Sequence, residues 1–218
     1  MDPLFPLWSF DMGVKITDTN RIPDLIKSLE KLNRMSIELG VFGSDDSFMA
    51  MIATVHEFGM TIKPKGQFLA IPTEKAQGKS PRDFNDLNFI SIQNGKKGLL
   101  VREEGQGGNG ARSDIYFILV RSVTIPERSF LRSTFDEKEK EWTRFAARQF
   151  AQVLVEKITV DIMFERLGQR MVADIQKTIR NMDSPPNAPL TAQNKGSSSP
   201  LIDTGRLRQS ITYRVVRD

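Results

Sequence analysis

The chain of 218 residues contains no cysteine and a single histidine. The lack of cysteine excludes disulfides and thiolate metal sites, which fits a reducing compartment or a fold that needs no covalent cross-link. No apolar run approaches the roughly 18 residues that a membrane-spanning helix requires. The apolar start "MDPLFPLWSF" is short and has no basic region before it, so we do not expect a signal peptide. With 39% hydrophobic and 27% charged residues, the composition is that of an ordinary globular protein.

The excess of basic over acidic residues is also small. The chain has 31 basic and 27 acidic residues, a net charge of +4. This excess is far smaller than that of a dedicated nucleic-acid-binding protein, which carries a basic stripe or patch. The composition therefore permits a weak attraction to DNA or to an acidic partner but does not predict one.

The first half of the chain alternates between helical and strand patterns. Residues 20–34 and 46–59 place apolar side chains at helical spacing, and residues 36–43 between them alternate as a strand does. Residues 64–118 contain short apolar runs separated by Gly, Asn and Pro, which predicts a β-rich segment. The sequence "NGKKG" at 94–98 predicts a hairpin turn within it.

A helical period replaces these patterns after residue 136. Asp136 with Glu139 predicts the start of a long helix through a capping box. A continuous helix over 137–182 would be about 70 Å long, which is too long for a compact domain. We therefore expect a possible break near 158–168, where β-branched residues and Gly168 occur.

The end of the chain has two parts. Residues 183–200 hold four prolines and four serines, which predicts an extended arm without a core of its own. Residues 201–218 read as a cap, a helical turn and a strand, and we term this segment the C-terminal clip. The predicted fold is α+β: a single domain over 1–182 in which an antiparallel sheet packs against the long helix, with an N-terminal helix before it and the arm and clip after it.

No motif predicts catalysis. His56 and Glu57 match half of the H-E-x-x-H zinc signature, but no second histidine exists. Gly78-Lys79-Ser80 lacks the preceding glycine of a phosphate-binding loop, and the glycine-rich run at 103–114 does not open a helix. We expect no enzyme, cofactor or metal. A hydrolase or nuclease using carboxylates and a divalent metal is the remaining enzymatic alternative, and no converging motif supports it.

The arginines suggest two roles. Residues 121–137 and 205–218 are locally basic but have no interleaved aromatic side chains on which bases could stack. Arginine is also enriched at interfaces, because its planar guanidinium pairs with carboxylates through two hydrogen bonds. We expect ion pairs within the chain or across a subunit boundary, with direct DNA contact as the alternative.

Three segments, in this order, resemble a known family. They are "IATVHEFG" (52–59), "VTIPERSFLRSTFDE" (123–137) and "PLIDTGRLRQSITYRVV" (200–216). Together they resemble the tail-completion or neck proteins of tailed bacteriophages, also described as virion-morphogenesis proteins. The long segment 64–118 resembles the larger versions from Mu-like phages with contractile tails.

The resemblance implies a structural role in the virion. Such proteins assemble as rings, commonly hexamers, at the junction between head and tail. They contact the head connector and the tail-tube, sheath or tail-terminator proteins, and the DNA channel passes through them. A protein of this kind is made in the host cytoplasm and stays in the virion. The alternative is a sequence-independent DNA-binding protein.

Fourteen residues of the three segments are the candidate structural and interface residues. We expect a structural turn at the first segment, a sheet-to-helix joint at the second and the clip at the third. They are His56, Glu57, Phe58, Gly59, Pro126, Arg128, Phe130, Arg132, Asp203, Thr204, Gly205, Arg206, Leu207 and Arg208.

Overall fold

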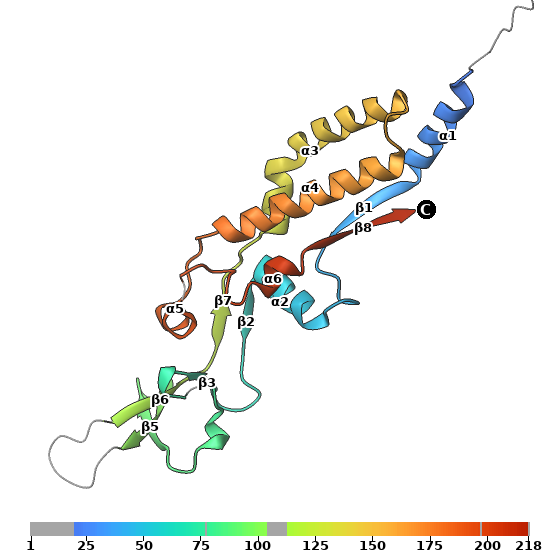
Figure 1. Ribbon diagram of the computed structural model, residues 1–218. Coiled ribbons are helices and arrows are strands. Elements are labelled where there is room, and N and C mark those ends of the chain that lie inside the picture. Colours follow the sequence, from blue (N-terminus) through green and yellow to red (C-terminus); the bar gives the residue numbers. More distant parts are fainter. Residues whose placement is uncertain (1–19, 77, 104–112, 197, 218) are drawn as a thin grey trace, which may run out of the picture.

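The computed structural model describes residues 20–76, 78–103, 113–196 and 198–217, and within them the fold is α+β, as predicted. The strands of the described residues form three antiparallel sheets instead of the one expected. Figure 1 shows a helical body at one end of the molecule and a separate four-stranded sheet at the other. The predicted glycine-rich loop at 103–114 and the apolar start fall largely or wholly outside the described residues.

The helical body is built on the two ends of the chain. Its elements are α1 (Ile22–Asn33), β1 (Met35–Gly40), α3 (Leu131–Leu154), α4 (Val160–Asn181) and β8 (Thr212–Arg217). Strands β1 and β8 pair antiparallel in register from Met35 opposite Arg217 to Gly40 opposite Thr212. Helices α3 and α4 pack as an antiparallel pair, and α4 lies against the β1–β8 ribbon. The C-terminal strand therefore pairs within its own chain.

The long helix is broken where the β-branched residues begin. Residues 155–159 separate α3 from α4, and the Thr159 side chain accepts a hydrogen bond from the Ile162 amide at the start of α4. Gly168 does not break the helix. It lies inside α4, where a Cβ would come within 2.3 Å of the Tyr213 ring, so the glycine lets β8 approach the helix.

The predicted start of the long helix at Asp136 is wrong. Helix α3 begins at Leu131, five residues earlier, and Asp136 lies within it. Phe130, at the N-cap position, offers no capping side chain. The four free N–H groups of a helix start need another acceptor, and the sequence near Asp136 gave a capping pattern that the helix does not use.

The β-rich segment forms its own small layer. Strands β3 (Leu69–Pro72), β4 (Asn88–Ile92), β5 (Lys97–Glu103) and β6 (Ser113–Val120) lie in the order β3-β6-β5-β4, with 3₁₀ turns at Glu74–Ala76 and Pro81–Asp83. The hairpin at 94–98 joins β4 to β5, as predicted. A small core of Ala76, Tyr116, Phe117 and Leu119 holds this layer. The paired strands β2 (Met60–Ile62) and β7 (Val123–Ile125) connect it to the body.

The proline-rich segment is not the purely extended arm that we expected. Residues 189–195 form a helix, α5 (Pro189–Lys195), and Pro200 is buried. Pro189 stands at the first helical position, where its missing N–H costs little. Helix α2 (Ser47–Phe58) and the short α6 (Arg206–Gln209) lie beside this segment at the end of the β1–β8 ribbon. Among the described residues, no helix is long and apolar enough to span a membrane.

Candidate functional site

The three segments that carry the family resemblance meet in one hydrophobic core. Ala53 comes from the first segment, Phe130 from the second, and Leu201, Leu207 and Ile211 from the third. All five are buried, and they pack with Ile175 and Ile179 of α4. Residues up to 158 positions apart in the sequence thus share one core, at the point where α2 ends and α3 begins.

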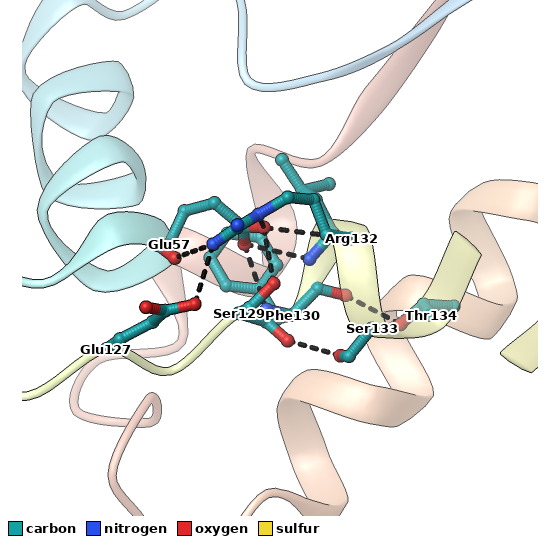
Figure 2. A network of polar contacts seen from close by, with 8 residues as sticks. Glu57, Glu127, Ser129, Phe130, Arg132, Ser133 and Thr134 are labelled. Atoms are coloured by element: carbon teal, nitrogen blue, oxygen red, sulfur yellow. Dashed lines mark hydrogen bonds and ion pairs between the residues drawn. The ribbon is translucent and has the colours of Figure 1, made fainter. Parts of the chain in front are cut away.

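Glu57 supplies the cap that α3 lacks. Figure 2 shows its carboxylate facing the first turn of α3. The Phe130 and Leu131 amides donate to Oε2, each at 2.9 Å, and the Arg132 amide donates to Oε1 at 3.0 Å. The Ser129 hydroxyl and the Arg132 Nε also donate to Oε1, at 2.7 and 3.0 Å. We term Glu57 and residues 129–132 the Glu57 network.

The charge of Glu57 is stabilised although the side chain is only 3% exposed. Burial by itself raises the pKa of this carboxyl group. Hydrogen bonds from Ser129, Leu131 and Arg132 outweigh burial and hold the pKa below its ordinary value of 4.5. The N-terminus of a helix also favours a negative charge. Glu57 is therefore an ionised, fully bonded anchor between α2 and α3.

The other residues of "HEFG" fix the same joint. The Arg128 amide donates to the His56 carbonyl at 2.7 Å. The Arg132 guanidinium lies 4.7 Å from the centre of the Phe58 ring and also bridges the Glu57 carbonyl and Glu127.

Gly59 must be glycine. Its φ is +68°, and a Cβ there would lie 2.9 Å from the Glu127 amide nitrogen and 3.1 Å from the Ile125 carbonyl oxygen. The chain can therefore pass from α2 into β2 close against the backbone that follows β7. Pro126, half-buried, begins the connection from β7 to α3.

Arg128 points to the opposite side of this connection and is only 4% exposed. Its Nε donates to the Pro185 carbonyl at 2.7 Å, and its Nη2 donates to the Pro186 carbonyl at 2.9 Å and to Asn187 Oδ1 at 3.5 Å. No carboxylate pairs with it among the described residues. Burial consequently lowers the pKa of Arg128. The arginine anchors the proline-rich segment to the joint by neutral oxygens alone.

The C-terminal clip is built as the sequence indicates. Gly205 has φ +80° and precedes α6, and the Thr204 hydroxyl accepts from the Arg206 amide at 3.5 Å. Leu207 is buried, whereas Asp203 is exposed and Arg208 is half-buried.

Three of the clip's arginines form ion pairs within the chain. Arg206 pairs with Asp46 at 3.0 Å, Arg214 with Asp45 at 2.6 Å and Arg217 with Asp161 at 2.9 Å. This agrees with the predicted pairing role of the arginines. Asp46 is also the N-cap of α2 and accepts from the Met49 amide at 2.9 Å, so the clip is fastened to the start of that helix.

A cavity of about 620 Å³ lies between α2, β7, α5 and the clip. Its basic lining residues are His56, Arg128, Lys195 and Arg206, and its one acidic residue is Asp203. Apolar side chains such as Ile52, Ile125 and Leu201 form most of its wall. We term this cavity the Arg128 pocket.

Within the described residues, Arg128 and Lys195 have no hydrogen-bonded carboxylate partner, and His56 has a ring nitrogen without a hydrogen bond. Lys195 donates to the carbonyls of Ser199 and Pro200. Burial lowers the pKa of Lys195, Asp203 raises it, and the charge of Arg128 lowers it again. The Nδ1 atom of His56 is buried without a hydrogen-bond partner in the described part of the chain. Burial, and then Arg128 and Lys195, lower the pKa of His56, so its ring is neutral near pH 7.

Sequence reasoning missed the partners of its own candidates. The sequence predicts only a turn at Glu57. A helix that begins after Phe130 has no capping side chain of its own and needs an acceptor from elsewhere in the chain, which is the role that Glu57 takes. Asp46 could have been identified as the N-cap of α2 from its place before the helical pattern, whereas its pairing with Arg206, 160 positions away, left no local signal. Nothing in the sequence around Lys195 indicated that it lines the cavity. In the described residues, no three His, Asp or Glu side chains come together in a way that could hold a metal ion.

No protein-family model, curated protein sequence or solved structure matches this chain. The family resemblance therefore rests on the three segments alone.

Proposed function

We propose that this chain is a structural protein of the phage neck that joins the head connector to the tail as a ring around the DNA channel. One observation carries the proposal: the three segments that resemble the neck family supply the residues of one joint, through the Glu57 network and the shared core. Residues that are merely similar by chance need not contact one another. Here each segment contributes a buried side chain to the same core, and the first two segments are also joined by the hydrogen bonds of the Glu57 network.

Helix α1 offers a surface for ring contacts. Ile22, Ile26 and Leu29 follow the i, i+4, i+7 spacing of one helix face, and they are 63, 49 and 43% exposed. Helix α1 buries none of its residues. An amphipathic helix of this kind is stabilised when a neighbour covers its apolar face. In a head-to-tail ring, the next subunit would cover it, because such a contact joins two different surfaces.

The proposed role is assembly and not catalysis or DNA recognition. Three of the four arginines in the clip are engaged by Asp45, Asp46 and Asp161. Basic side chains that remain near the channel would act on the DNA backbone without reading its sequence.

The test is complementation of a phage that lacks this gene. Deleting residues 200–218 is not a suitable variant, since Leu207, Ile211 and β8 belong to the fold itself. The Ile26→Gln/Leu29→Gln variant instead changes only the exposed face of α1. We expect full heads and complete tails that fail to join, seen by electron microscopy of the lysate, with the purified variant monomeric.

A matched control uses the same helix. Asp24→Asn/Lys27→Gln introduces two amides on the opposite side of α1 and leaves the net charge unchanged. This variant is expected to restore joined particles. Joined, infectious particles in the complete absence of the protein would overturn the proposed function. Joined particles with the α1 face variant would reject this face as the ring contact.

A further inference from the structure

The Arg128 pocket has the construction of a binding site for a carboxylate on an apolar segment. Its volume of about 620 Å³ lies within the range of roughly 300–1,000 Å³ that is usual for specific ligand sites. The buried Arg128 uses Nε and Nη2 for its three hydrogen bonds, and none of these involves Nη1. Arg128 and Lys195 together face one carboxylate, Asp203, across the cavity.

A buried positive charge without an anionic partner is costly, and the protein's own oxygens only partly offset that cost. A carboxylate placed between Arg128 and Lys195 would form charge-assisted hydrogen bonds, which are about twice as strong as neutral ones. His56 also lines the cavity, but its Nδ1 atom is fully buried, so Arg128 and Lys195 are the groups that would hold the carboxylate. Around these atoms, Ile52, Ile125 and Leu201 favour apolar side chains beside the carboxylate.

One segment of this chain has the complementary chemistry. Residues 2–11, "DPLFPLWSFD", contain two carboxylates, no basic residue, and five large apolar side chains. Pro3 and Pro6 restrict the backbone, so that such a segment loses less conformational entropy when it binds in an extended form. Phe5, Trp8 and Phe10 are residue types that commonly anchor interfaces.

The geometry favours the segment of a second copy. Helix α1 and strand β1 follow each other along the body and lead from the start of α1 toward α2 and α6 (Figure 1), two elements whose residues line the pocket. Twelve helical and six extended residues span about 38 Å. The nine residues from Asp11 to Asn20 reach at most about 32 Å. This limit concerns Asp11, which stops short of the pocket of its own chain, whereas Asp2, eighteen residues before Asn20, has a reach of about 65 Å. Asp11 can therefore enter the pocket only from a neighbouring copy.

We propose that the Arg128 pocket binds residues 2–11 of a second copy of this chain, with Asp11 of that segment between Arg128 and Lys195. This contact joins two different surfaces, so it propagates from subunit to subunit and can close into a ring. The proposal does not depend on the neck assignment, because it concerns only how copies of the chain associate.

The first experiment is crosslinking of the full-length protein. A photoreactive phenylalanine analogue replaces Phe5 or Phe10, and chains with natural-abundance nitrogen and with ¹⁵N are mixed before illumination. We expect crosslinks to peptides that contain Ile52, Ile125 or Leu201, with one light and one heavy partner. Crosslinks confined to single chains, or located elsewhere on the surface, would overturn the proposal.

The second experiment measures the role of charge with a labelled peptide of residues 2–11 and the full-length protein. The Asp2→Asn/Asp11→Asn peptide is expected to bind at least about tenfold more weakly. The His56→Gln/Lys195→Met protein, checked for an unchanged circular dichroism spectrum, is expected to lose a similar factor. A protein variant Arg82→Gln, remote from the pocket, is the control and should bind the peptide normally. Equal binding of both peptides, binding of neither, or no effect of the pocket variant would each contradict the proposal.

Discussion

Two buried charged side chains, Glu57 and Arg128, contact other segments at the connection from β7 to α3. They differ in how completely the protein pairs their charges. Glu57 accepts five hydrogen bonds, four of them from a helix start and its flanking serine and one from a guanidinium. Among the described residues, the Arg128 side chain donates only to neutral oxygens of the proline-rich segment, and it lies against a cavity. The anion is enclosed and fully paired, whereas the cation is enclosed and only partly paired.

This difference suggests a stabilising role for Glu57 and a binding role for Arg128. A buried charge whose hydrogen-bonding capacity is filled by the protein can do little except hold its partners together. A buried charge that keeps an uncompensated field beside a cavity can attract a ligand of opposite sign. We infer that the Glu57 network fixes the fold and that the Arg128 pocket is the side of the joint available for interaction.

The largest predicted effect follows from breaking the Glu57 network. In Glu57→Gln, an amide group would place N–H donors against the amides of Phe130, Leu131 or Arg132. Removing one partner of a buried charged network costs about 3–5 kcal/mol. We expect the free energy of unfolding, measured in urea, to fall by that amount. The backbone amides in the first turn of α3 should also lose protection from hydrogen exchange.

Glu127 provides the control for this substitution. It pairs with the same guanidinium of Arg132 but is 56% exposed. Glu127→Gln should change the free energy of unfolding by less than about 1 kcal/mol. Equal effects of the two substitutions would show that Glu57 does not act as the cap of α3.

A smaller effect is expected on the other side of the joint. Arg128→Lys keeps the positive charge but cannot reproduce the two hydrogen bonds to the Pro185 and Pro186 carbonyls. Hydrogen bonds of a charged donor contribute about 1.5–3 kcal/mol. We expect hydrogen exchange in residues 188–196 to accelerate while α3 stays protected. Acceleration throughout the body would instead place Arg128 in the same cooperative unit as Glu57.

The two sides should also differ in their response to acid. The pKa of Glu57 is lower in the folded protein than its ordinary 4.5, so its contribution to stability is complete above that pH. The contribution is lost as the pH falls through the folded-state pKa. The difference in unfolding free energy between wild type and Glu57→Gln should therefore shrink below pH 4.5, while the difference for Arg128→Lys should not shrink through this titration. Urea titrations at several pH values measure both, and a constant difference for Glu57→Gln would contradict the assigned charge.

The sequence predicted the helices and strands of this joint better than it predicted the contacts between them. Periodicity located α1, α2 and the strands, because amphipathic spacing is a local property. The positive φ of Gly59 and Gly205 could also be predicted, because glycine next to a helix end or a turn is typical of a position with positive φ.

What could not be predicted depends on residues far apart in the chain. The start of α3 at Leu131 is set by a carboxylate 74 positions earlier, so the local capping pattern at Asp136 was misleading. The arrangement of the strands as three sheets instead of one depends on how the ribbon β2–β7 departs from the body. The helix in residues 189–195 is short and polar, and its position is supported by Arg128 and by Asn194, which donates to the Pro72 carbonyl.

The smallest predicted effect concerns the clip, where the charges are paired at the surface and not in the interior. Arg206 pairs with Asp46 but is more than half exposed, so solvent and salt screen the pair. Arg206→Gln should lower the melting temperature by less than about 4 °C. Added salt should reduce the difference further, whereas it should leave the effect of Glu57→Gln nearly unchanged, because a buried network is screened little. Thermal unfolding at low and high salt measures both. A large, salt-independent loss in Arg206→Gln would mean that the clip is fastened by its ion pair and not by Leu207 and Ile211.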